Sequence, residues 1–154
     1  LVFLPIYYTP ASMILQQAAN MEYKPIFFGV DGMDGILNIE GFDTSLAEGV
    51  MLLTPFSADN PAENVQSFVK KYQEAYGATP DQFAADAYDA IYAIKAAVEK
   101  AGSTSGAALA SALTSLTVEG VTGTMTWTAD GNTNKPASAI LYYDGVGTLF
   151  DSQD

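Results

Sequence analysis

The first third of the chain alternates between short apolar runs and a helical pattern, and this alternation limits the fold more than any other feature. Apolar runs at residues 1–4, 25–28 and 49–54 each have the length of a buried strand. Between the first two runs, residues 10–20 place small and apolar side chains at helical spacing. A strand–helix–strand order predicts a parallel sheet with right-handed crossovers, so we expect an α/β fold.

Two loops follow the first two predicted strands and hold residue types that suit ligand binding. The first loop carries Tyr7 and Tyr8, and the second carries Asp31 and Asp34 between glycines. In parallel sheets, ligands bind where the strands end and the loops begin. Asp31 followed by Gly32 is equally typical of a plain turn in which the carboxylate bonds its own backbone. Side-chain alternation also allows only one of the two tyrosines to face a cleft.

Composition removes several classes of function. The 154 residues carry a net charge of −12 with no arginine and no cluster of lysines, which argues against nucleic-acid binding. Histidine and cysteine are absent, which removes Ser-His-Asp and Cys-His catalysis and nearly all zinc and iron sites. We therefore expect no catalytic residue, no metal and no other cofactor. No apolar run is long enough to cross a bilayer.

The middle of the chain has the pattern of three helices. Apolar positions at helical spacing predict them at residues 61–76, 80–100 and 107–116. In the second helix, the inward face is expected to consist of Ala84, Ala87, Ile91, Ile94 and Val98. Asp86 and Asp89 lie on its opposite side and are expected to face solvent or a hinge.

The last third has the pattern of β-structure. Alternation from Val121 to Trp127 predicts one strand, and residues 137–143 predict another. The pair Asp144-Gly145 predicts a two-residue hairpin that leads into a final strand.

Three helices beside so short a sheet indicate that the chain divides between two lobes. In this interpretation residues 1–54 and 137–154 form one lobe, and residues 57–134 belong to another. The chain would cross between the lobes at residues 55–57 and 134–136, where prolines stand.

Six short segments together resemble the type I periplasmic solute-binding proteins of ATP-driven amino-acid uptake, in particular the leucine/isoleucine/valine-binding family. They are Ile6-Tyr7-Tyr8-Thr9-Pro10, Phe28-Gly29-Val30-Asp31-Gly32, Ala47-Glu48-Gly49-Val50, Val65-Gln66-Ser67-Phe68-Val69-Lys70-Lys71-Tyr72, Phe83-Ala84-Ala85-Asp86-Ala87-Tyr88-Asp89-Ala90 and Gly120-Val121-Thr122-Gly123. Each segment alone is loose, but their order and spacing are fairly specific. Family members are about twice as long, so the chain resembles their C-terminal half.

The resemblance implies two α/β lobes joined by three crossings, with a solute trapped between them. Residues 1–54 and 137–154 would form a Rossmann-like parallel-sheet lobe, and the helices of residues 57–134 would belong to the second lobe. The resemblance also implies a non-catalytic protein that hands an amino acid or a related solute to a membrane ABC permease. Such proteins are periplasmic or extracellular, and some are membrane-anchored lipoproteins.

The resemblance also assigns roles to single residues. Asp31 matches the acid that pairs with the α-ammonium group of the ligand, and Asp34 is the alternative if the turn points Asp31 away. Tyr7 is preferred to Tyr8 as the ring that contacts the ligand. Phe83 matches an aromatic residue that reaches the ligand from the other lobe, although core packing is the more common role of a lone Phe at a helix start.

Other functions fit the sequence less well. On the same fold, the chain could be a ligand-sensing domain of a receptor or a binder of amides or other small solutes. An enzyme would need Asp31 and Asp34 as a carboxylate pair across a substrate, and two acids in one loop do not obviously face each other. If the chain is half of a longer protein, the helices of residues 57–134 would expose apolar faces that ordinarily cover a sheet, which predicts a dimer or a swapped oligomer.

Overall fold

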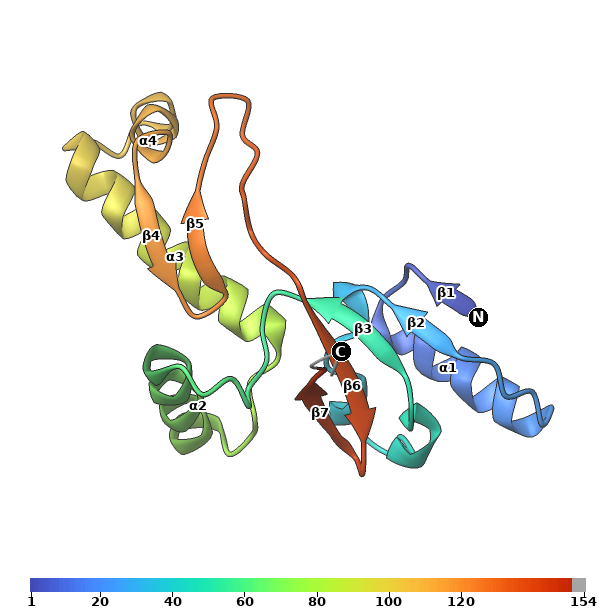
Figure 1. Ribbon diagram of the computed structural model, residues 1–154. Helices are drawn as coiled ribbons and strands as arrows, with labels where there is room; N and C mark the ends of the chain where they lie inside the picture. The colour runs from blue at the N-terminus through green and yellow to red at the C-terminus, as the bar shows by residue number, and fades with distance from the viewer. Residues whose placement is uncertain (151–154) are drawn as a thin grey trace. The chain divides into compact units, whose positions relative to one another are not determined.

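The strand–helix–strand order of the first third becomes part of a five-stranded sheet in the computed structural model, which describes residues 1–150 (Figure 1). The strands lie in the order β1-β2-β3-β6-β7. Their bounds are Val2–Leu4 for β1, Phe27–Gly29 for β2, Met51–Thr54 for β3, Ser138–Tyr143 for β6 and Val146–Leu149 for β7. The first three strands pair in parallel, whereas β6 and β7 run antiparallel to their neighbours. The expected α/β fold is confirmed.

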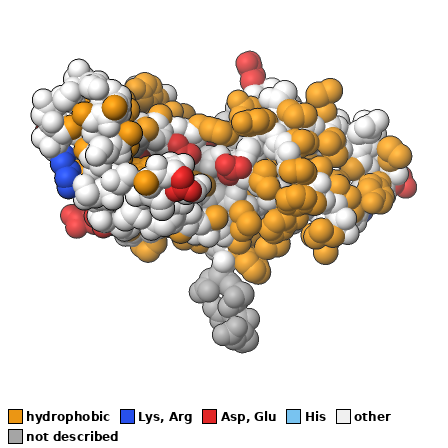
Figure 2. Space-filling view, turned by 90° about the horizontal axis from the view of Figure 1, so that it is seen from above, with side chains coloured by type: hydrophobic (Ala, Val, Ile, Leu, Met, Phe, Trp, Pro, Cys, Tyr) orange, Lys and Arg blue, Asp and Glu red, His pale blue; other side chains and the backbone are white. Residues whose placement is uncertain are grey.

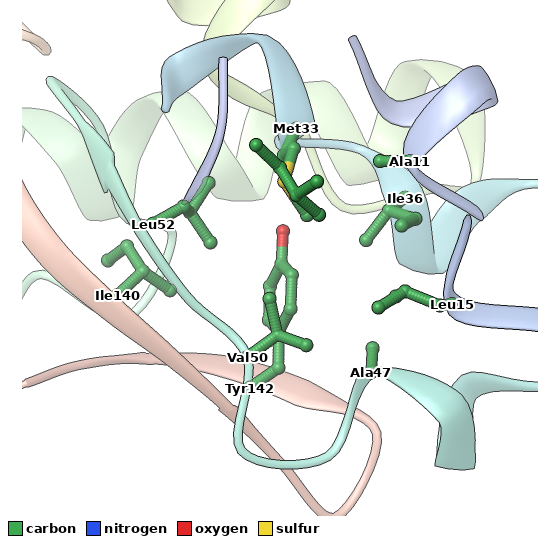
Figure 3. Packing of buried hydrophobic residues seen from close by; sticks show 10 residues of the cluster. Ala11, Leu15, Met33, Ile36, Ala47, Val50, Leu52, Ile140 and Tyr142 are labelled. Atoms are coloured by element: carbon green, nitrogen blue, oxygen red, sulfur yellow. The ribbon is translucent and has the colours of Figure 1, made fainter. Parts of the chain in front are cut away.

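One face of this sheet is covered by helices. The longest is α1 (Tyr8–Asn20), and its predicted apolar stripe is correct, since Ala11, Leu15 and Ala18 are buried. Three short 3-10 helices complete the cover; they are η1 (Asp31–Met33), η2 (Ile36–Asn38) and η3 (Thr44–Ala47). Figure 3 shows that the ring of Tyr142 points from its strand into the cluster that these elements form with the sheet.

The chain divides into two compact units. The first unit comprises Leu1–Asn60 and the segment from Ala137 onward, and the second comprises Pro61–Pro136. The five-stranded sheet, α1 and the 3-10 helices all belong to the first unit. The assignment of the two units to two lobes of a longer protein stays a prediction.

The opposite face of the sheet is apolar, and we call it the bare face. Its residues Phe3, Phe28, Met51 and Leu141 pair in register on neighbouring strands, so their side chains point to the same side. Phe3 is 53% exposed, and Leu53 on the same side is 41% exposed. Figure 2 shows many hydrophobic side chains at the surface of the first unit. Because parallel sheets normally carry helices on both faces, the bare face resembles an interior surface.

The predicted hairpin at Asp144-Gly145 is confirmed. Both residues have positive φ, 51° and 73°, as a two-residue turn between β6 and β7 requires. The backbone N–H of Gly145 donates to Oε1 of Glu48 at 3.2 Å, so the tip of the hairpin is tied to the loop that precedes β3.

The second unit contains the three predicted helices and a small hairpin. The helices are α2 (Glu63–Tyr76), α3 (Gln82–Ala101) and α4 (Gly106–Leu113), and the hairpin strands are β4 (Thr117–Gly120) and β5 (Gly123–Thr126). The strand predicted from Val121 to Trp127 is present as β5, but it begins later, because Val121 and Thr122 form the turn that precedes it. The strand before this turn, β4, was not predicted from the sequence.

The turn between β4 and β5 is held by a buried carboxylate. Asp89 on α3 is 2% exposed, and it accepts the backbone N–H groups of Val121 and Thr122, both at 2.9 Å. It also accepts the hydroxyl of Thr122 at 2.5 Å. A Cβ added to Gly120 would lie 2.3 Å from Oδ2 of Asp89, so only glycine fits there. The prediction that Asp89 faces solvent or a hinge is wrong, because its carboxylate satisfies the buried backbone of this turn.

The inward face of α3 also differs from the predicted one. Its buried residues are Gln82, Ala85, Asp89, Ala93 and Ala97. Ile91 and Ile94 are 65% and 53% exposed, whereas the alanines of the opposite stripe are buried. Asp86 is half-buried and forms an ion pair with Lys135.

Aromatic rings line the junction of α2 and α3. The ring of Phe68 lies 5.9 Å from that of Tyr72 and 4.8 Å from that of Tyr88. The row continues on both helices, with the ring of Tyr76 4.7 Å from that of Tyr72 and the ring of Tyr92 4.8 Å from that of Tyr88. A hydrogen bond with the Tyr92 hydroxyl, together with burial, raises the pKa of Tyr88 to about 12. The Tyr88 hydroxyl therefore stays protonated to a higher pH than that of an ordinary tyrosine.

Replacing Asp89 tests the role of this carboxylate. The Asp89→Ala variant leaves two buried backbone N–H groups without their acceptor, and we expect a loss of roughly 3 kcal/mol in unfolding free energy, measured in urea. Glu99→Ala on the same helix is the matched control. Glu99 pairs with Lys95 at the surface, and its loss should cost less than about 1 kcal/mol. Equal losses in the two variants would contradict the role assigned to Asp89.

Candidate functional site

The carboxyl ends of β1 and β2 lie side by side at one edge of the sheet, which we call the carboxyl edge. Leu4 and Gly29, the last residues of the two strands, are register partners. The loops that follow also touch, since a Cβ added to Gly32 would lie 3.1 Å from the carbonyl oxygen of Ile6 and 3.4 Å from Cδ1 of Tyr7. The expectation that the two loops share one edge is confirmed.

Asp31 is exposed and begins η1, directly beyond β2. Its Oδ1 accepts the backbone N–H of Gly32 at 2.9 Å, and its carbonyl oxygen accepts the N–H of Asp34 at 3.0 Å. The plain-turn interpretation is therefore correct for these two contacts, and ligand binding by Asp31 stays a prediction. A carboxylate offers about four acceptor positions, so one that shapes a turn can also accept hydrogen bonds from a ligand.

Asp34 stands at the end of η1 and is half-buried. Its Oδ1 accepts the backbone N–H of Gly35 at 3.0 Å, and the hydroxyl of Tyr142 lies 3.5 Å from the same oxygen. These contacts direct the side chain toward the fold, where it links the loop to β6. They suit a structural role better than a role as the second acid of a catalytic pair.

The two tyrosines differ in exposure, although neither is a strand residue to which side-chain alternation applies. Tyr7 precedes α1 and is 66% exposed, with its ring against the backbone of Gly32. Tyr8 is the first residue of α1, is half-buried, and packs against the hydrophobic cluster of the first unit. Of the two rings, Tyr7 is the one that the carboxyl edge presents to solvent.

Phe83 lies in the second unit, so it is not among the residues that the first unit brings together. It stands in the first turn of α3 and is 37% exposed. Asp81 caps this helix by accepting the backbone N–H of Ala84 at 3.0 Å. The Phe83 ring is exposed enough to be accessible to a ligand, and its role in binding stays a prediction.

The sequence did not reveal how the turn that begins with Asp31 packs against the end of β2. Met33 is fully buried and folds back over the end of β2, where a Cβ added to Gly29 would lie 2.2 Å from its sulfur. Gly29 and Gly32 are therefore glycines because other groups occupy the space of their side chains. The spacing of the glycines around Asp31 hinted at this, but the position of Met33 did not appear in any local pattern.

Two further findings limit the chemistry of residues 1–150. No group of three or more acidic side chains in this part of the chain is placed to hold a metal ion. None of the helices described for it has the length and apolar character that crossing a membrane demands.

The family follows from a comparison with family models. A model described as "Periplasmic binding protein" matches residues 3–146. The chain belongs to this family. A search of curated proteins finds no match.

Solved structures of periplasmic binding proteins share the fold of this chain. A leucine binding protein, LivK, from Thermotoga maritima has a TM-score of 0.83 and 23% identity over 97% of the chain. LivJ is a branched-chain amino acid transporter substrate binding protein from Streptococcus pneumoniae, solved in complex with isoleucine. It has a TM-score of 0.82 and 26% identity over 96% of the chain. An ABC transporter solute binding protein from R. palustris in complex with benzoate has a TM-score of 0.83 and 20% identity over 96% of the chain.

The chain spans less than half the length of these proteins, 43% of LivK and LivJ and 41% of the benzoate complex. The resemblance to the leucine/isoleucine/valine-binding family is confirmed by the family match and by these structures. The fold is that of a type I periplasmic binding protein lobe with additional helices.

The packing of Met33 over Gly29 can be tested by adding one methyl group. The φ of Gly29 is ordinary, so Gly29→Ala adds no backbone strain but places its Cβ against the Met33 side chain. We expect a loss of about 2 kcal/mol in unfolding free energy, as is typical of overpacking. Gly106→Ala is the matched control, because nothing lies within 4 Å of its added Cβ. A loss no larger than that of the control would show that Met33 does not occupy this space.

Proposed function

We propose that this chain is part of a longer extracytoplasmic solute-binding protein of an ABC uptake transporter, which captures an amino acid of the branched-chain type without chemical change. Its membership of the periplasmic binding protein family supports the general role. Its coverage of less than half of the similar solved proteins supports the view that a longer protein performs the whole function.

The observation that carries this proposal is the meeting of Asp31 and Tyr7 at the carboxyl edge. The two residues come from neighbouring loops, and the backbone of Gly32 brings those loops into contact. Asp31 would accept hydrogen bonds from an α-ammonium group, and the Tyr7 ring would cover the apolar part of the solute. Phe83 would contribute from the second unit.

The charges of the first unit support a solute with a positive group. Lys24 is the one cationic side chain among residues 1–60 and 137–150. It stands before β2, whereas Asp31 stands after that strand, so the two lie toward opposite ends of it. The carboxyl edge is therefore negative, which favours an ammonium group over a free carboxylate at this position.

A second candidate solute class comes from the comparisons. Among the similar structures is one in complex with benzoate, which has no ammonium group. The same fold could also serve as a ligand-sensing domain of a receptor or bind amides. A thermal-shift panel of amino acids, amides and benzoates separates the solute classes, since a ligand at 100 times its dissociation constant adds about 2.7 kcal/mol of stability.

Catalysis is not part of the proposal. The contacts of Asp34 with Gly35 and Tyr142 engage it within the fold, which does not favour a carboxylate pair. The proposed partner is a membrane permease, and the proposed location is periplasmic or extracellular, in line with the family. Attachment as a lipoprotein is a further prediction, to be tested by membrane fractionation of cells that make the parent protein.

Replacing Asp31 tests the proposed ligand contact. In the longer receptor that contains this chain, we expect Asp31→Ala to weaken L-leucine binding by roughly tenfold to a hundredfold, the equivalent of one charge-assisted hydrogen bond, measured by calorimetry. Glu40→Ala is the matched control, an exposed acid of the same unit. Unchanged affinity in Asp31→Ala would contradict the proposed site.

The bare face predicts that the chain on its own associates into a dimer or a swapped oligomer. Phe3, Phe28 and Met51 form a continuous apolar surface there, and such surfaces promote association. Light scattering should give more than the mass of one chain, and Phe3→Asp should shift the distribution toward the monomer. A monomer at every concentration for the unsubstituted chain would contradict this expectation.

A further inference from the structure

We propose that Gly32 is a positioning residue for solute binding, which holds Tyr7 and Asp31 together by leaving no side chain between their loops. The inference rests on the proposed function, because it assumes that these two residues bind the solute. It assigns a role to a residue that cannot contact the solute through a side chain of its own.

The space beside Gly32 is already filled. An added Cβ would lie 3.1 Å from the carbonyl oxygen of Ile6, 3.4 Å from the carbonyl carbon of Ile6 and 3.4 Å from Cδ1 of Tyr7. The distance to the carbonyl oxygen is shorter than an ordinary contact, whereas the two distances of 3.4 Å are at the short end of the ordinary range. A methyl group at position 32 would therefore push the first loop away from the second.

The requirement for glycine here is one of space and not of backbone conformation. The φ of Gly32 lies outside the left-handed region, unlike that of Gly35, which is 87°. An alanine at position 32 would keep the same backbone angles without strain. Any effect of the substitution then reports on the contact with Ile6 and Tyr7.

Neither loop can give way easily. The turn that holds Asp31 is closed by the N–H of Met33, which donates to the carbonyl of Val30 at 2.9 Å, and Met33 is fully buried beneath it. On the other side, the carbonyl of Tyr7 accepts the N–H of Ala11 at 3.1 Å at the start of α1. The atom nearest to the added methyl is the carbonyl oxygen of Ile6, so any relaxation would move the first loop together with the Tyr7 ring that it carries.

A double-mutant cycle on solute binding tests the inference in the longer receptor that contains this chain, with L-leucine as the probe. Gly32→Ala should weaken binding about tenfold, the loss expected when the ring is moved from its place. In the Tyr7→Ala background, the same substitution should change affinity by less than about twofold, because the ring whose position the first loop sets is gone. Gly106→Ala, with open space around its added Cβ, should leave affinity unchanged.

The outcomes separate this inference from the proposed function. If Asp31→Ala weakens binding but Gly32→Ala and Tyr7→Ala act additively, the positioning role is wrong and the proposed function stands. If L-leucine does not bind the unsubstituted receptor, the proposed function is contradicted. In that case the positioning role is tested on the ligand-free protein by NMR. Nuclear Overhauser contacts between the Tyr7 ring and the α-protons of Gly32 should appear, and their absence would overturn the positioning role.

Discussion

The parallel pairing of β1 with β2 is the interaction on which the candidate site depends. Because the two strands run in the same direction and Leu4 pairs with Gly29, the loops that follow them begin at the same height of the sheet. A buried methionine beneath the second loop and a glycine between the loops then set their spacing. The exposed carboxylate and the exposed ring are neighbours because of this backbone arrangement, and no direct bond between them is required.

The two units use carboxylates in opposite ways. Asp89 in the second unit is buried, and backbone N–H groups of one turn saturate it, so it serves the stability of the hairpin. Asp31 in the first unit is exposed at the end of a strand, where it shapes a turn and faces solvent. Burial therefore distinguishes the structural acid from the candidate binding acid, although both are aspartates in segments that resemble the family.

The structure differs from the sequence-based expectations mainly in which face of α3 is buried and in the turn that packs on this helix. The α3 sequence offers both an alanine stripe and an isoleucine stripe at helical spacing, and periodicity alone cannot choose between them. The alanine stripe is buried, which places Asp89 inside and leaves Ile91 exposed. The same carboxylate binds the backbone at Val121, so the first residues of the alternating segment form a turn, and the strand β4 before this turn pairs with β5.

The sequence by itself determined the strand–helix–strand order, the hairpin at Asp144 and the absence of histidine and cysteine chemistry, because these depend on neighbouring residues or on composition alone. Only the tertiary structure decided which tyrosine is exposed, which stripe of α3 is buried and why position 32 is a glycine. Each of these depends on atoms that are distant in the sequence and close in space, such as the carbonyl of Ile6 beside Gly32. Contacts of this kind leave no periodic pattern in the chain.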